Sequence, residues 1–165
     1  KNLGKQFPAM SLIFANKSMV AGSIIIRHCT FTDFNAGLLH MTEEKDNKGY
    51  YNAEKIVISN NSITNLQGAL LAIYRGGNDE STMGPDLAFS NNRLENCNCE
   101  STTPLISLYG VQKSQLDKNL FSNCNTGNIL ITYEDVVRAM HRLKNNQFIN
   151  SGSIRKNEFV REAGQ

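Results

Sequence analysis

The sequence predicts an all-β protein that folds as one parallel β-helix, a solenoid of about five to six coils. The first observation is a six-residue pattern rich in asparagine, which recurs along the 165-residue chain. The second is a set of short segments with alternating apolar residues beside each copy, which is typical of half-buried strands. The third is the absence of a convincing amphipathic helix between the copies. The clearest copies are NNSITN from Asn60, NNRLEN from Asn91, KNLFSN from Lys118 and NNQFIN from Asn145.

The second residue of each copy predicts a column of stacked side chains. Weaker copies, HCTFTD from His28 and KNEFVR from Lys156, extend the series at both ends. Successive members lie 32, 31, 27, 27 and 11 residues apart, and the last spacing predicts a truncated turn. Stacked asparagines can hydrogen-bond to one another and to the backbone, and they tolerate left-handed turns, so most of the 21 asparagines are interpreted as structural. The column comprises Cys29, Asn61, Asn92, Asn119, Asn146 and Asn157.

Large apolar residues flank this column at fixed distances and predict the core. Each repeat is expected to contain two or three short strands, and the segment from Glu134 to Leu143 fits either one short helix or a strand. Three residues before each column member stand Ile26, Ile58, Phe89, Leu116, Leu143 and Ile154. Two residues after it stand Phe31, Ile63, Leu94, Phe121, Phe148 and Phe159. A second alternating unit places Leu39, Leu71, Ile106 and Ile129 on one face with Met41, Ile73, Leu108 and Ile131.

Composition bounds the classes of function. Residues 1–165 are sufficient for a single domain with a core of its own. The net charge is +2 and the basic residues are scattered through the sequence, so no nucleic-acid footprint is predicted. No apolar run is long enough to span a membrane. The sequence begins at Lys1 without a charged and then apolar leader, and a signal peptide is expected to be absent or already removed.

The cysteines and histidines predict no metal site. Cys97 and Cys124 both fall five residues after their column members, so they are expected to stack on adjacent coils within disulfide range. Two buried free thiols in an apolar column are the preferred interpretation. No CxxC pair is present and the histidines lie in different columns, so a zinc site is not expected. The acidic residues considered as calcium ligands are interpreted as ordinary loop charges; they are Glu43, Glu44, Asp46, Asp79 and Glu80.

A polar segment, YRGGNDESTMGP from Tyr74 to Pro85, marks the edge at which the repeats vary in length. Insertions of different length follow Thr42, Tyr74, Tyr109 and Thr132, and solenoids often bind ligands on the face that carries their insertions. Tyr74 and Tyr109 are expected to stack outward in the column of Thr42 and Thr132. The alternative is that these residues only fix a long turn or dock another domain. The candidate site for a polar, anionic sugar chain comprises Tyr74, Arg75, Asn78, Asp79, Glu80 and Tyr109.

The segments RGGNDESTMGP, FSNNRLENC and LISLYGVQKSQLDKNLFSNC resemble the C-terminal region of polysaccharide lyase family 6, the alginate lyases and chondroitinase B-like lyases. The resemblance runs from about Ile24 to Phe159, and GGNDEST is its most specific part. It implies a right-handed parallel β-helix. It also implies a bacterial, secreted or periplasmic protein whose larger relatives carry two such helices and cleave uronic-acid polysaccharides by β-elimination.

The resemblance further implies a catalytic lysine base, an arginine acid and a calcium ion that neutralises the substrate carboxylate, as abstraction of the C5 proton requires. Gln112-Lys113-Ser114 occupies a place comparable to the SKS of the family, but the next coil reads LITYED and lacks the arginine. Arg138 is nearby but out of register. We therefore expect no catalytic residue, metal or cofactor in this chain, and assign the catalytic set, with its calcium, to an upstream helix of the parent enzyme.

The sequence thus predicts the C-terminal β-helix domain of an alginate lyase-like protein, inactive by itself. Its expected partners are an upstream catalytic β-helix domain and a uronic-acid polysaccharide, either alginate or a glycosaminoglycan, whose groove it supports or extends. Two alternatives stay open. One is a non-catalytic carbohydrate-binding module with Tyr74 and Tyr109 as its platform. The other is a complete small uronan lyase with Lys113 or Tyr133 as the base.

Overall fold

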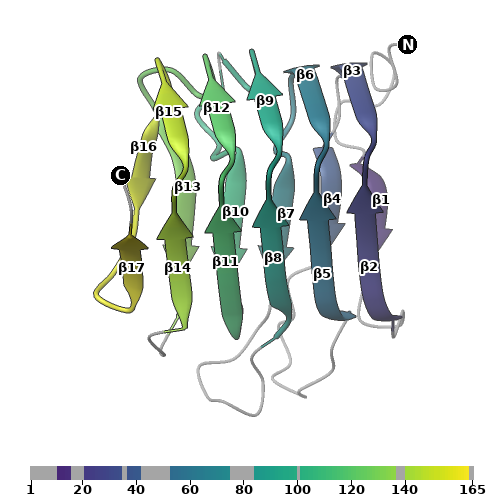
Figure 1. Cartoon of the computed structure of the whole chain (residues 1–165), viewed down its shortest axis with the longest axis vertical. Helices are drawn as coiled ribbons and strands as arrows, with labels where there is room; N and C mark the ends of the chain where they lie inside the picture. The colour runs from purple at the N-terminus through teal and green to yellow at the C-terminus, as the bar shows by residue number, and fades with distance from the viewer. Residues whose placement is uncertain are drawn as a thin grey trace.

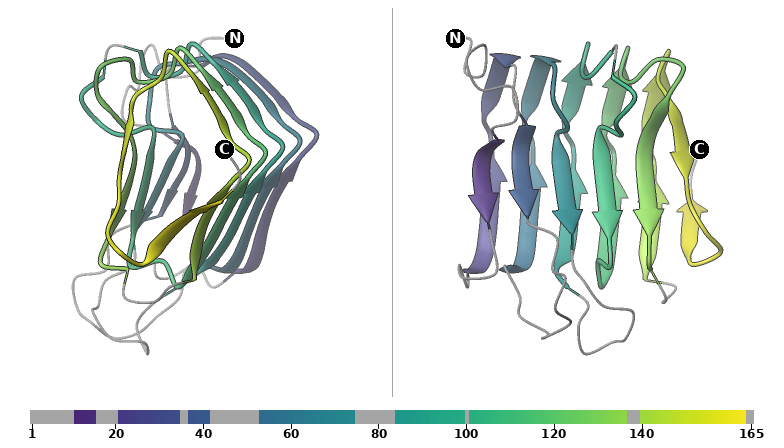
Figure 2. Two further views of the ribbon diagram at one scale, coloured as in Figure 1. Left: turned by 60° about the vertical axis from the view of Figure 1, so that its left-hand side comes forward. Right: turned by 180° about the vertical axis from the view of Figure 1, so that it is seen from behind.

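The computed structural model confirms the parallel β-helix. It describes residues 11–15, 21–34, 37–41, 53–74, 84–99, 101–136 and 140–163. Within these ranges the chain forms strands joined by turns and contains no helix. The strands build three parallel sheets of six, six and five strands, and a complete coil passes through each sheet once (Figures 1 and 2).

The three sheets are named A, B and C here, and their strands follow in the order in which they are hydrogen-bonded. Sheet B contains β2 (Ala21–Arg27), β5 (Ala53–Ser59), β8 (Asp86–Ser90), β11 (Lys113–Asp117), β14 (His141–Lys144) and β17 (Val160–Ala163). Sheet C contains β3 (Thr30–Phe34), β6 (Ser62–Leu66), β9 (Arg93–Glu95), β12 (Leu120–Ser122) and β15 (Gln147–Ile149). Sheet A contains β1 (Ser11–Ala15), β4 (Gly37–Met41), β7 (Leu71–Tyr74), β10 (Ile106–Tyr109), β13 (Ile129–Glu134) and β16 (Ser153–Arg155).

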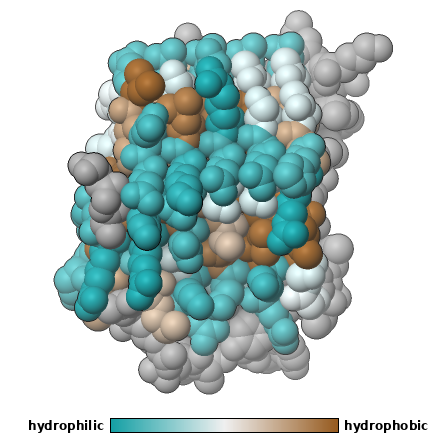
Figure 3. Space-filling view, viewed as in Figure 1, coloured by the Kyte–Doolittle hydropathy of each residue, from teal (hydrophilic) through white to brown (hydrophobic). Residues whose placement is uncertain are grey.

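The predicted asparagine column is a buried hydrogen-bonded ladder at the corner between sheets B and C. The side chain of Asn92 donates from Nδ2 to the backbone oxygen of Ile58 and to Oδ1 of Asn119, both at 3.0 Å. The same contacts recur from coil to coil, and Cys29 joins the ladder through its backbone N, which donates to Asn61 Oδ1 at 2.9 Å. The residues just before the ladder hold φ values between 52° and 58°; they are His28, Asn60, Asn91, Lys118 and Asn145. This corner forms the hydrophilic band across the middle of Figure 3.

The core columns of sheets B and C are confirmed for five coils, and the assignment of the sixth is wrong. Asn157 lies outside the ladder, between β16 and β17, where its Nδ2 donates to the backbone oxygen of Val136. Ile154 pairs with Ile131 in sheet A, and the sheet B partner of Leu143 is Glu162. The spacing of 11 residues is too short for a coil, so KNEFVR repeats the sequence pattern at a different corner. Phe159 accordingly follows β16 and is not part of the sheet C column that ends at Phe148.

The predicted register of the fourth coil in sheet A is wrong by two residues. Leu39, Leu71 and Ile106 are in register as expected, but Ile106 pairs with Ile131 rather than with Ile129. Tyr109 consequently pairs with Tyr74 on one side and with Glu134, not Thr132, on the other. The cause is the corner between sheets C and A, because the stretch from β9 to β10 spans residues 96–105 and that from β12 to β13 spans residues 123–128. Length therefore varies at this corner too.

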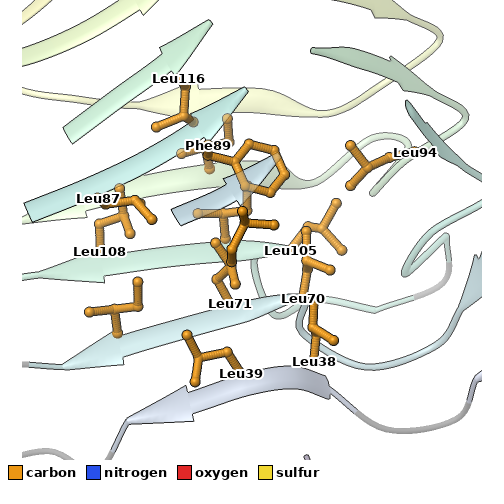
Figure 4. Packing of buried hydrophobic residues seen from close by; sticks show 14 of the residues in the cluster. Leu38, Leu39, Leu70, Leu71, Leu87, Phe89, Leu94, Leu105, Leu108 and Leu116 are labelled. Carbon is orange, nitrogen blue, oxygen red and sulfur yellow. The ribbon is translucent and has the colours of Figure 1, made fainter. Parts of the chain in front are cut away.

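Aliphatic and aromatic side chains from all three sheets fill the interior (Figure 4). Phe121 lies between Phe89 and Phe148, with ring centroids 6.3 Å and 5.2 Å away. Cys97 and Cys124 are fully buried free thiols, in agreement with the preferred interpretation. Burial and the neighbouring thiol of Cys124 raise the pKa of Cys97. In the segment that was open between helix and strand, residues 134 and 141–143 belong to strands, and residues 137–139 lie outside the described part.

Candidate functional site

The predicted sugar-binding residues fall mostly outside the described part of the chain. Arg75, Asn78, Asp79 and Glu80 are not described, and for Tyr74 only its place at the end of β7 is given. Tyr109 is half-buried at the end of β10, in register with Tyr74. The acidic loop residues considered as calcium ligands also lie outside the described ranges. These residues therefore stay predicted ligands, and the described neighbourhood is that of the strands that follow them.

A hollow of about 570 Å³ lies where the strands of sheet B begin. Its lining includes Pro85, which directly follows the predicted binding segment and precedes β8. We call it the strand-start hollow. Charged and polar side chains dominate its rim; they are Glu54, Lys55, Asp86, Gln112 and Lys113, with Met140 beside them.

Lys113, the lysine compared with the catalytic base of the lyases, lies on the rim of this hollow. Its Nζ is 4.0 Å from Asp86 Oδ2, and half of its side chain is exposed. The next coil offers no cation at a matching position, since Met140 precedes β14 and the first strand residue, His141, points inward. A lysine base without a nearby acid does not complete an elimination site. No group of three His, Cys, Asp or Glu side chains that could hold a metal occurs in the described ranges, so no calcium-dependent step is derived.

Behind the hollow, three polar side chains are enclosed in the interior of the coil. Ser114 Oγ lies 2.9 Å from Nδ1 of His141, and the ring of Tyr133 packs edge-on against His141 with centroids 5.9 Å apart. Burial lowers the pKa of His141 to about 4 and raises the pKa of Tyr133. Tyr133 is 3% exposed, and its buried hydroxyl faces the core rather than a polymer outside. This burial argues against Tyr133 as a catalytic base.

The outer face of sheet B carries a cluster of exposed cations at its C-terminal end, which we call the basic face. Arg142 on β14 pairs in register with Arg161 on β17, and Lys144 projects from the same side of β14. All three side chains are exposed, and no described carboxylate lies within ion-pair distance of any of them. Figure 3 shows hydrophilic residues over β14 and β17 and a hydrophobic patch toward β2. That patch includes Ile25, which is 55% exposed.

Sequence reasoning missed the basic face because it treated the basic residues as scattered. The signal was present in the alternation of HRLK at residues 141–144 and VREA at residues 160–163, where each basic residue follows an apolar or inward position. The pairing of Arg142 with Arg161 was hidden by the wrong assignment of the last repeat. Lys113, on the neighbouring strand β11, was found but was weighed only as a catalytic base.

Comparison with known proteins adds no assignment to this geometry: no family model matches the chain, and no curated protein matches it. Within the described ranges, no helix has both the length and the apolar character needed to cross a membrane.

Proposed function

We propose that this chain is a β-helix domain of an alginate lyase-like protein, inactive alone, and that it binds a uronic-acid polysaccharide along the basic face of sheet B. The observation that carries the proposal is the in-register pair Arg142 and Arg161, exposed and without a described counter-charge. The resemblance of the sequence to the uronan lyases supports it from an independent direction.

Two arginines directly opposite each other on neighbouring strands repel each other, and such pairs destabilise a sheet. An anion placed between them reverses the sign of that interaction. Guanidinium groups bind carboxylates in a bidentate manner, and this geometry suits a carboxylate better than a point cation does. A polyuronate presents one carboxylate on each sugar, so a chain laid along the solenoid meets cations on successive coils, as Lys113, Arg142 and Arg161 do on β11, β14 and β17.

The predicted ligands fit the same surface. The segment that contains Arg75 and Asn78 connects β7 to β8, and β8 begins at the strand-start hollow. A polysaccharide bound across β11 and β14 therefore passes close to the point where this segment enters sheet B. In the parent protein this surface would continue the substrate groove of an upstream catalytic helix, in a secreted or periplasmic setting.

The binding is tested by titrating an oligomannuronate hexasaccharide into the purified chain. We expect the double variant Arg142→Gln/Arg161→Gln to lose about tenfold or more in affinity, with a weaker dependence on salt. The matched control is Arg93→Gln, which removes an exposed arginine from sheet C that pairs with Glu95 at 3.3 Å. Equal affinity of the double variant and the control would contradict the proposed face.

The catalytic alternative has its own assay, the absorbance of the unsaturated product formed by β-elimination. We expect no turnover of alginate, polymannuronate or dermatan sulfate by this chain, with calcium present. Turnover that disappears in Lys113→Ala would establish a complete small lyase instead. Activity that returns only when the upstream region is restored would support the proposed domain role.

A further inference from the structure

A second row of asparagines lies at the opposite ends of the strands from the strand-start hollow, where sheet C turns toward sheet A (Figure 1, top). Each member donates from its Nδ2 to Oδ1 of the preceding member. The distances are 2.9 Å from Asn65 to Asp33, 3.5 Å from Asn96 to Asn65, 3.2 Å from Asn123 to Asn96 and 2.8 Å from Asn150 to Asn123. We call this row the outer ladder.

The buried and outer ladders differ in how completely their amides are satisfied. A side-chain amide offers two N–H donors and two acceptor lone pairs. Asn92 in the buried ladder uses all four, because Nδ2 donates twice and Oδ1 accepts twice. Asn96 in the outer ladder uses one donor and one lone pair among the described contacts. The outer ladder therefore presents one free donor and one free acceptor on each inner coil, repeated at the strand spacing of about 4.8 Å.

A hollow of about 600 Å³ opens beside this ladder. The outer ladder forms one side of it, through Asp33, Asn65 and Asn96, and the turn after β9 forms another, through Asn98 and Ser101. This turn is held by its own contacts. Asn98 Nδ2 donates to the backbone oxygen of Thr103 at 2.8 Å, and the hydroxyls of Ser101 and Thr103 are 2.7 Å apart. The wall is thus fixed before any ligand arrives, which lowers the entropic cost of binding.

Two further features of the hollow indicate the chemistry of its ligand. Asn98 is 2% exposed, and its Oδ1 accepts no hydrogen bond from the described residues. A buried acceptor of this kind favours a partner that donates, such as a hydroxyl. The described lining includes the carboxylate of Asp33 and no cation, so the hollow disfavours an anionic ligand. This is the opposite of the basic face.

We infer that the outer ladder and its hollow bind a neutral oligosaccharide, whose paired hydroxyls engage the free donor and acceptor of successive asparagines. The inference does not rest on the proposed binding of uronan, because the two surfaces lie at opposite ends of the strands and carry opposite charge. A protein with both surfaces would hold an acidic and a neutral polysaccharide at the same time.

The experiment titrates four neutral probes, cellohexaose, mannohexaose, xylohexaose and maltohexaose, into the isotopically labelled chain and follows the side-chain amide signals by NMR. We expect at least one probe to shift the signals of Asn65 and Asn96. Asn96→Gly should weaken that probe about tenfold, because glycine keeps the φ of 52° and removes only the amide. Asn91→Gly is the matched control, since Asn91 is exposed with a φ of 53° at the other corner.

A second variant guards against loss of folding in Asn96→Gly. Gln67 lines the hollow with an exposed side chain, and Gln67→Ala should weaken the same probe without altering thermal unfolding. Binding of the neutral probe should persist in Arg142→Gln/Arg161→Gln, which separates this inference from the proposed function. The inference is overturned if none of the four probes binds, if Asn96→Gly and Gln67→Ala bind as tightly as the parent chain, or if Asn91→Gly weakens binding equally.

Discussion

Asn92 Oδ1 accepts two hydrogen bonds from Asn61, one from the backbone N at 3.1 Å and one from Nδ2 at 3.0 Å. One amide oxygen thus satisfies two buried donors of the preceding coil at a corner where the strands turn away from each other. Repetition of this contact allows the chain to turn at the same place in every coil without leaving unpaired polar groups in the core. It is the reason why asparagine, a poor strand former, is abundant in this sequence.

Replacement of Asn92 by alanine should therefore be severe. The change leaves the two donors of Asn61, the backbone oxygen of Ile58 and Oδ1 of Asn119 without their partner in a buried corner. We expect a loss of about 3 kcal/mol or more in the free energy of unfolding, measured by denaturant titration. Asn91→Gly, one residue away on the exposed side, should change it by less than about 1 kcal/mol. Similar losses in both variants would contradict the ladder as the stabilising element.

Stability should fall as the pH drops from 7 to 4. His141 titrates near 6.5 when unfolded, whereas burial lowers its pKa to about 4 in the folded chain. Between these values the unfolded state binds the extra proton, so the contribution is complete above pH 6.5 and is lost as the pH falls toward 4. The difference corresponds to on the order of 3 kcal/mol. His141→Gln should flatten this pH dependence, and His28→Gln, an exposed control, should leave it unchanged; an identical slope in both variants would exclude His141 as its source.

Gly152 should not tolerate a side chain. A Cβ at this position would meet the backbone oxygens of Asn128 and Asn125, the latter at 2.6 Å. Backbone atoms cannot rotate aside as a flexible side chain can, so Gly152→Ala should lower the melting temperature by several degrees or more. Gly22→Ala provides the comparison, because a Cβ on Gly22 would meet nothing within 4 Å. If Gly152→Ala melts at the temperature of Gly22→Ala, the close approach of these coils is incorrect.

The four thiols should differ in reactivity. Cys29 and Cys99 are half-buried, whereas Cys97 and Cys124 are fully buried, and burial also raises the pKa of Cys97. Because the thiolate is the reactive form, iodoacetamide should label Cys29 and Cys99 in the native chain well before the other two. Peptide mass spectrometry reads this order directly. Early labelling of Cys97, or a Cys97–Cys124 disulfide in the purified chain, would contradict the buried free pair.

The sequence was sufficient to predict the coil, the ladder and five members of each core column of sheets B and C, because these follow from a strict repeat. It failed where length varies. Ile129 was placed beside Ile106 because the turn before β13 differs in length from the turn before β10, and no local signal fixes such a register. Asn157 was counted as a ladder member because its short motif matched, although the spacing excludes a complete coil.

The candidate sites show the same division. The exposed amide of Asn96 looks like that of Asn92 in the sequence, and only the hydrogen-bond contacts show that one is saturated and the other is not. Arg142 and Arg161 are 19 residues apart, a spacing that no other pair of coils uses, so their pairing depends on knowing that β17 follows a short turn. Register across coils of unequal length comes from packing and not from the local pattern.

The most direct test of the proposed function is a chemical-shift map of the chain with an oligomannuronate hexasaccharide at low and moderate salt. The account predicts shifts in the backbone amides of β11, β14 and β17, centred on Arg142 and Arg161, which diminish as salt is added. Shifts confined to the turns between sheets C and A, or no shifts at any concentration of the sugar, would contradict the assignment of a uronan-binding surface to sheet B.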